Sequence, residues 1–455
     1  MKNNKLIAII AVFTLVFSNL SLADDNVYGP YPITLKGYSG DKTNSVSYSG
    51  QIARHVLHDS LKSLSSKGDL DEMLAYFNGS EKNKAIIAPA SKDDFVIKQT
   101  LMNDLSKGKN LSGKTYKGVI NGWPGGMTGP EVLEFMIKKA SESPKGFDAS
   151  TGYNYTQLIS KFAMGAVFYN QAIDNYLDEK LAADNKPNSK PYKEGAYYTG
   201  KEHVWDEAFG YWGAAAHALN LTAEQNYNVA KKKDMGSADY NNDGVVDLKK
   251  EYTFAHAYYA SSYDKSGKTK YLETVTKAFL DGRKLITSAD GENLTDAERS
   301  KLYDYVNVIE KNWEKVIAES VFKYAGSVYL DMNKLETDTS DKNFSTYAKH
   351  WGELKGFALA LQCGKSNLGE TAVKLNRMIG YGPVLLNSSQ VVGVDSNGNY
   401  IKDQAQEWDE YKLHMLKIQK LMIDEFGVKA RSKDQLAEMA DLAEKLGSSD
   451  SAEND

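Results

Sequence analysis

The sequence predicts an all-α protein built as two related antiparallel helical bundles joined by long loops. Proline is scarce, with nine in 455 residues, so few positions would break a helix. Apolar residues recur at helical spacing through most of the chain. Regular alternation of apolar and polar residues is confined to short stretches, which is not the pattern of a large sheet. Helix packing around two cores therefore accounts best for the sequence.

The predicted elements follow in chain order. Helical periods cover residues 49–66, 92–107, 130–141, 154–181, 202–220, 269–286, 295–335, 344–362, 369–378, 404–426 and 433–446. Thr295 with Glu298 is spaced as a capping box, and Ser432 stands similarly before the last helix. Small hairpins are expected at 27–35 and at 391–401, the second turning at 395–398.

The first residues indicate export. Lys2 and Lys5 precede an apolar run over 6–17, and Ser21 and Ala23 place small residues where a signal peptidase reads. Cys363 is the only cysteine, so no lipid-anchor cysteine stands at that point. We expect a periplasmic or secreted protein without a membrane span in the mature chain. The predicted division is a signal peptide (1–23), an N-terminal bundle (24–220), a connection (221–267), a C-terminal bundle (268–446) and a disordered acidic tail (447–455).

Composition and missing motifs narrow the function. The formal net charge is −5 and charges of both signs are interspersed, so we expect no nucleic-acid partner. The chain has no Gly-x-Ser-x-Gly elbow, P-loop or HExxH zinc motif. Twenty-nine tyrosines are many for this length, and such rings suit half-buried surfaces.

A weak internal repeat suggests that the two bundles arose by duplication. Residues 160–168 and 314–322 share an apolar pattern, including a Lys at 161 and 315 and a Phe at 168 and 322. In each half this helix precedes one with a Trp-x-Glu sequence, Trp205 to Glu207 and Trp351 to Glu353. Chance matching between helical sequences is the alternative explanation.

Two His/carboxylate groups are the candidate transition-metal site. On a helix, residues three or four apart share a face, so His203 lies alongside Asp206 and Glu207, and His350 alongside Glu353. Imidazole with carboxylates can hold a metal ion or exchange a proton. A solvated pair, or a histidine satisfied by its neighbour, is the structural alternative. The aromatic residues crowding both groups favour a buried site.

A second candidate metal site follows the EF-hand pattern. Oxygen ligands at alternate positions would come from the loop, with a glycine at its sixth position for the sharp turn. The expected calcium ligands are Asp239, Asn241, Asp243, the Val245 carbonyl, Asp247 and Glu251. Lys250 occupies the twelfth position, so Glu251 would close the shell one residue later. An Asx-rich turn without metal is the alternative.

The chain as a whole resembles the imelysin-like proteins, and most closely a relative of that group catalogued as a bacterial domain of unknown function. The resemblance rests on residues 46–50, 165–169, 203–210, the Asp239 loop and 350–357. It implies two related helical bundles with a cleft between them, at which a Gly-x-His-x-x-Glu sequence signature lies. It also implies a role in iron or haem acquisition, or metallopeptidase activity. His203 matches the signature histidine, whereas Asp206 replaces the glutamate and Lys201 replaces the glycine.

Three functions are therefore open. The first is an exported metal-binding protein in iron uptake or handling, with an added structural Ca²⁺. The second is a non-enzymatic envelope interaction protein that binds a peptide, glycan or protein partner. The third is a metallopeptidase in which Glu207 would act as base. We expect binding rather than catalysis.

Overall fold

The computed structural model describes residues 25–79, 82–182, 185–366 and 368–447. These residues form a predominantly helical protein with two small antiparallel hairpins, which confirms the all-α prediction. The predicted signal peptide (1–23) and residues 448–455 of the predicted tail lie outside them. In the described ranges we find no helix with the length and apolar character needed to cross a membrane.

The first half of the chain holds short and medium helices. In order these are α1 (Ser49–Leu64), α2 (Leu70–Asn78), α3 (Met102–Leu105), η1 (Ser112–Lys114), α4 (Gly129–Ser141), η2 (Pro144–Gly146), α5 (Tyr155–Ala163), η3 (Met164–Tyr169), η4 (Gln171–Glu179), α6 (Lys180–Ala182), α7 (Gly200–Trp212), η5 (Ala218–Asn220), α8 (Ala223–Ala230) and α9 (Met235–Ala238). The first hairpin pairs β1 (Phe147–Asp148) with β2 (Tyr153–Asn154).

The second half holds the longest helices. In order these are α10 (Ala255–Asp264), α11 (Tyr271–Ser288), α12 (Asp296–Leu335), α13 (Asp341–Leu361), α14 (Gly369–Ile379), α15 (Trp408–Phe426), η6 (Leu436–Glu438) and α16 (Met439–Lys445). The predicted hairpin at 391–401 is confirmed as β3 (Ser389–Val394) with β4 (Tyr400–Gln404). The capping box that starts α12 is also confirmed, because Glu298 accepts the Thr295 N–H at 2.7 Å.

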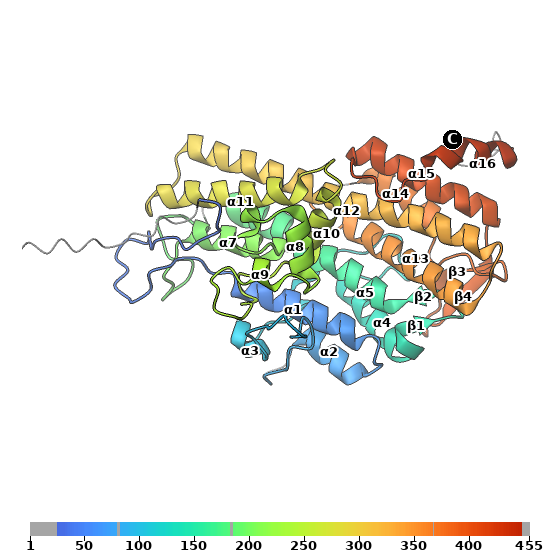
Figure 1. Ribbon diagram of the computed structural model, residues 1–455, viewed down its shortest axis with the longest axis horizontal. Coiled ribbons are helices and arrows are strands. Elements are labelled where there is room, and N and C mark those ends of the chain that lie inside the picture. Colours follow the sequence, from blue (N-terminus) through green and yellow to red (C-terminus); the bar gives the residue numbers. More distant parts are fainter. Residues whose placement is uncertain (1–24, 80–81, 183–184, 367, 448–455) are drawn as a thin grey trace, which may run out of the picture.

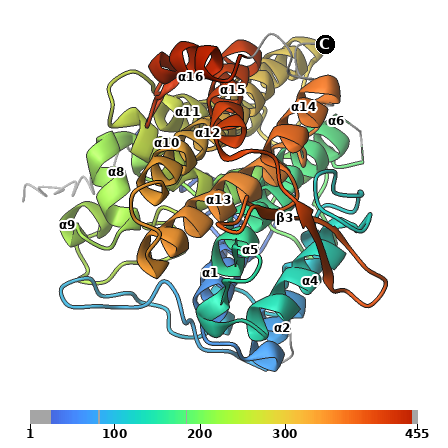
Figure 2. The same cartoon turned by 90° about the vertical axis from the view of Figure 1, so that its right-hand side faces the viewer.

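The helices lie in layers. Figures 1 and 2 show α1, α2 and α4 along one side of the molecule and α11, α15 and α16 along the opposite side, with α5 and α13 between them. The 40-residue α12 runs along the upper layer and packs on α11, α13 and α15. Because α5 packs on α13, elements from the two predicted bundles share one interior.

Part of the long helix after Tyr155 is wound as π-helix. The segments η3 and η4 continue α5 without a break, as the predicted helix at 154–181 requires. A Cβ built on Gly165 in η3 would lie 2.4 Å from the Ala360 Cβ. The absent side chain at Gly165 therefore allows the wide helix to approach α13 closely.

Several predicted elements are wrong. Residues 92–101 are irregular instead of helical, because the backbone at Val96 and Lys98 pairs with Val246 from the distant connection. The segment 27–35 forms no strand. The helix predicted at 202–220 ends at Gly213, which adopts a left-handed φ of 81°, and the last helix begins at Met439 instead of Lys433. The sequence reading also missed α2, α8 and α10.

Candidate ligand-binding site

Helix α7 positions the first His/carboxylate group. Its start is fixed by Thr199, whose Oγ1 accepts the Glu202 N–H at 3.2 Å. One turn later, His203 Nε2 lies 3.6 Å from Glu207 Oε2, at the predicted helical spacing. The His203 ring stacks on Tyr198, with 4.2 Å between ring centroids. Burial lowers the pKa of His203 to about 4, so this imidazole is neutral at pH 7.

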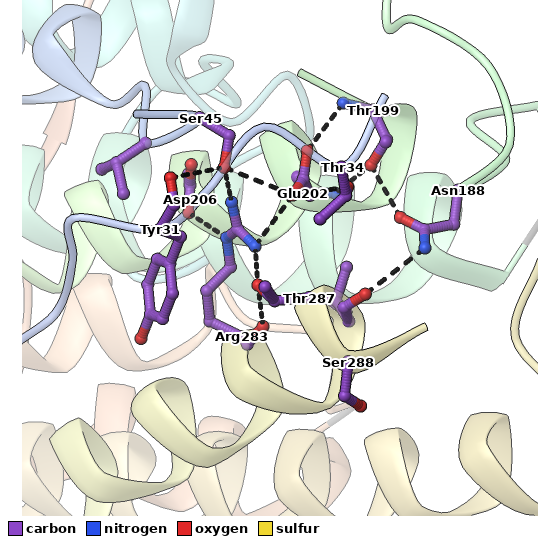
Figure 3. A network of polar contacts seen from close by, with 12 residues as sticks. Tyr31, Thr34, Ser45, Asn188, Thr199, Glu202, Asp206, Arg283, Thr287 and Ser288 are labelled. Carbon is purple, nitrogen blue, oxygen red and sulfur yellow. Dashed lines mark hydrogen bonds and ion pairs between the residues drawn. The ribbon is translucent and has the colours of Figure 1, made fainter. Parts of the chain in front are cut away.

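Asp206 does not join His203, although both lie on α7. Its Oδ1 accepts from Arg283 Nε at 3.0 Å and from the Tyr28 hydroxyl at 2.8 Å. Its Oδ2 accepts the Ser47 N–H at 2.9 Å. Figure 3 shows Arg283 between Asp206 and Glu202, with Ser45 beside the guanidinium. All of these contacts are internal, so Asp206 is the counter-charge of a buried arginine.

Arg283 is fully buried on α11. Burial alone would lower its pKa, but the carboxylates of Asp206 and Glu202 more than offset this and raise it. The guanidinium therefore stays charged and ties α7 to α11 and to the N-terminal segment. Sequence reasoning missed this partner, because 77 residues separate Arg283 from Asp206 and no local pattern connects them.

The second group, on α13, also has partners from other helices. His350 Nδ1 lies 2.5 Å from Asp331 Oδ2 of α12. Glu353 Oε1 accepts from the Tyr324 hydroxyl at 3.1 Å and lies 3.9 Å from Lys161 Nζ of α5. His350 and Glu353 line a cavity that His203 and Glu207 do not line. Across the described part of the chain, no three His, Cys, Asp or Glu side chains are grouped as a metal site would require.

The cavity beside His350 and Glu353 has a volume of about 810 Å³. Its walls come mainly from α1, α5, α10, α12 and α13 and from the segment before α10, so all three predicted regions of the mature chain contribute. Among its aromatic residues are Tyr252, Tyr258, Tyr259 and Tyr324. Thr253 is 1% exposed, and its hydroxyl has no hydrogen-bond partner among the described residues. The volume lies within the range usual for small-molecule sites.

Lysines dominate the polar lining of this cavity. Lys161 and Lys323 lie on α5 and α12, and five others surround them: Lys62, Lys231, Lys232, Lys349 and Lys433. Asp59 and Glu353 are the only carboxylates among the described lining residues. Burial lowers the pKa of Lys323, and burial together with the nearby charge of Lys62 lowers the pKa of Lys161 well below its usual value.

In the sequence, Lys161 stands out only as the match of Lys315 in the internal repeat. Its position inside the apolar run 158–169 is the signal that could have identified it, because a lysine in such a run is expected to be buried.

The Asp239 loop, which is the predicted calcium loop, is an Asx-rich turn. The Asp239 carboxylate accepts the N–H groups of Asp243 at 3.1 Å and Gly244 at 2.8 Å, and Gly244 has a φ of 84°. Val246 is buried and pairs with the 96–98 segment.

Glu251, not Lys250, turns back to this loop. Its Oε2 accepts the Asp247 N–H at 2.8 Å. The side chain is 1% exposed, and its Oε1 has no hydrogen-bond partner among the described residues, with Lys250 Nζ 3.9 Å away.

Comparison with known proteins gives one match. No curated protein and no solved structure matches the chain. The profile of the family described as "Domain of unknown function (DUF4856)" matches residues 136–368, slightly more than half of the sequence. The match runs from α4 past α13 and so includes α7, the Asp239 loop and most of the cavity wall. The chain belongs to the DUF4856 family of domains of unknown function.

Proposed function

We propose that this protein is a non-enzymatic binding protein whose ligand occupies the cavity beside His350 and Glu353. The observation that supports this role is the cavity itself, about 810 Å³ in volume and walled mainly by α1, α5, α10, α12, α13 and the segment before α10. Preformed concave sites of this size are the usual form of a small-molecule site. The role corresponds to the interaction protein that the sequence offers as an alternative to iron handling.

Filling the cavity tests the proposal. Ser327 is a buried residue of the cavity wall on α12, so a tryptophan there would occupy ligand space. Isothermal titration calorimetry with saccharide, peptide and organic-anion probes should detect binding to the wild type, loss of binding in Ser327→Trp and retention in Ser327→Ala. Circular dichroism of both variants controls for folding. If no probe binds the wild type, or if Ser327→Trp binds as well as wild type, the cavity is not the binding site.

We also propose that the Asp239 loop binds a structural Ca²⁺. The turn geometry, the buried Val246 anchor and the unpartnered Glu251 Oε1 support this assignment. Ca²⁺ would be held by Asp239, Asn241, Asp243, the Val245 carbonyl, Asp247 and Glu251. The four carboxylates of this set are not already gathered as a metal site, so the ion would have to draw them together. Asp247 Oδ1 already accepts from Gln99 at 2.6 Å, so the ion would strengthen the link between this loop and the 96–99 segment.

Iron binding at His203 and Glu207 is a second candidate function. It is supported by a neutral imidazole next to Glu207 Oε2, which has no hydrogen-bond partner among the described residues. Asp206 is already engaged by Arg283, so further ligands would have to come from elsewhere. Elemental analysis of protein purified without chelator tests this: bound iron should be lost in His203→Ala and kept in His217→Ala. Unchanged iron in His203→Ala would remove the candidate.

A peptidase would in addition show chelator-sensitive cleavage that Glu207→Gln abolishes.

We also propose that the protein is exported, that it is related to the imelysins, and that its two bundles arose by duplication. The basic start and apolar run of the sequence support export to the periplasm. N-terminal sequencing of the mature protein should begin at Asp24. The imelysin resemblance and the internal repeat rest on the sequence motifs alone.

A further inference from the structure

We propose that the ligand of the cavity is a multiply charged organic anion, a saccharide-sized molecule bearing several carboxylate, phosphate or sulfate groups. This inference rests on the proposed binding function, since it names the chemistry of the same cavity. The observation that points to it is a charge imbalance. The whole chain carries a formal net charge of −5, yet seven lysines and only two carboxylates line this cavity. Positive charge concentrated in a concave surface attracts and concentrates anions.

The inner part of the cavity holds little negative charge of its own. Lys161 is 2% exposed, and its one ion-pair partner among the described residues is Glu353, at 3.9 Å. Glu353 also accepts the Tyr324 hydroxyl, so it is shared between two donors. With so distant a counter-charge, the charged form of Lys161 is incompletely compensated, and an anionic group placed beside it would favour the ammonium form and supply what is missing.

Three of the other cavity lysines are held by neutral partners. Lys231 Nζ lies 4.8 Å from the Tyr258 ring centroid, and Lys232 donates to the Ala90 carbonyl at 2.7 Å. Lys323 Nζ lies 4.9 Å from the Tyr324 ring centroid. Within the described residues, no cavity lysine other than Lys161 forms an ion pair. Rings and carbonyls position these ammonium groups without neutralising them, which leaves the charges available to a ligand.

The form of the cavity indicates a ligand with dispersed charges. Its described lining contains lysines but no arginine, so it offers separate point charges and no fork for a single carboxylate or phosphate. A cavity of about 810 Å³ is far larger than one inorganic anion needs. Tyrosine rings among the lysines provide flat surfaces on which sugar rings can stack. These features together fit an acidic saccharide-sized molecule.

Calorimetry with matched probes tests the inference. We would titrate trigalacturonate and tripolyphosphate, which separate carboxylate from phosphate as the preferred group, against neutral maltotriose. At least one anion should bind, and its affinity should fall by about ten-fold or more between 20 and 200 mM NaCl because several ion pairs form. Lys161→Met and Lys323→Gln should each weaken binding by about ten-fold. Lys277→Gln, on the exposed face of α11, should leave binding unchanged.

Glu353→Gln should raise the affinity for anions, whereas the lysine substitutions lower it. Removing one of the two cavity carboxylates should tighten anion binding several-fold, whereas a merely damaged cavity would bind more weakly. The inference is overturned, while the binding function stands, if maltotriose binds in a Ser327→Trp-sensitive manner and neither anion does. It is also overturned if anion affinity is unchanged in Lys161→Met and Lys323→Gln. If no probe binds, or if binding survives Ser327→Trp, the proposed function fails with it.

Discussion

Asp206 and Arg283 form an ion pair that is closed to solvent: the Arg283 Nε lies 3.0 Å from Asp206 Oδ1, and both side chains are 0% exposed. Glu202 contacts the same guanidinium at 3.2 Å, so two buried carboxylates share one arginine as their counter-charge. Arg283→Met leaves both carboxylates buried without a counter-charge, and should lower the free energy of unfolding by about 3–5 kcal/mol. Urea denaturation followed by circular dichroism measures this loss.

The same helix supplies the control. Lys277 pairs with Asp281 on the exposed side of α11, and Lys277→Met should change stability by less than about 1 kcal/mol. Equal losses in the two variants would show that burial of the Asp206 pair has no energetic consequence.

His256 should make the fold sensitive to acid. Burial, with the nearby charges of His55, His58 and Lys161, lowers the His256 pKa to about 3, and neither ring nitrogen has a partner among the described residues. In the unfolded chain a histidine binds its proton near pH 6.5. Stability is therefore full above pH 6.5 and is lost as the pH falls from there toward 3.

Substitution isolates this contribution. Between pH 7 and pH 5 the wild type should lose about 2 kcal/mol more than His256→Leu. Urea titrations at both pH values measure the difference, and equal pH dependence of the two proteins would contradict the prediction.

Chelation should destabilise the protein through the Asp239 loop. At a Ca²⁺ concentration one hundred times the Kd, bound Ca²⁺ adds about 2.7 kcal/mol, so EGTA should lower the urea midpoint measurably. Asp239→Ala should remove the response to EGTA. Asp395→Ala is the matched control, because Asp395 caps a similar Asx turn in the β3–β4 hairpin outside the loop. A full EGTA response in Asp239→Ala would exclude this loop as the calcium site.

Gly165 should not accept a side chain. The added Cβ would meet the Ala360 backbone and side chain at 2.4–2.7 Å, and the helical backbones would have to separate. We expect Gly165→Ala to destabilise the protein by about 1–3 kcal/mol, despite the better helix propensity of alanine. Gly236→Ala is the control, since its Cβ would meet nothing closer than 3.9 Å and should leave the thermal midpoint nearly unchanged.

Local signals predicted most of the fold. The Thr295 capping box, the long apolar periods and the Asp395 turn act within a few residues, and the structure contains the corresponding elements. The error at 92–107 has the opposite origin, because a backbone pairing with Val246 overrides the local helical pattern.

The candidate site was less predictable for the same reason. Helical spacing placed His203 next to Glu207 correctly, but it could not show that Asp206 faces Arg283, which is distant in sequence. Nor could it gather Lys161 and Lys323 around one cavity, because that convergence depends on how α5 packs beside α12 and α13.

The residues of the Arg283 cluster are synthesised at different times. Ser45, Glu202 and Asp206 leave the ribosome before Arg283, so the two carboxylates lack their counter-charge until residue 283 follows. Buried carboxylates cannot close on one another alone, so the early segment that contacts Asp206 through Ser47 has to wait for α11. We therefore expect a nascent chain halted before α11 to leave this early segment undocked from α7.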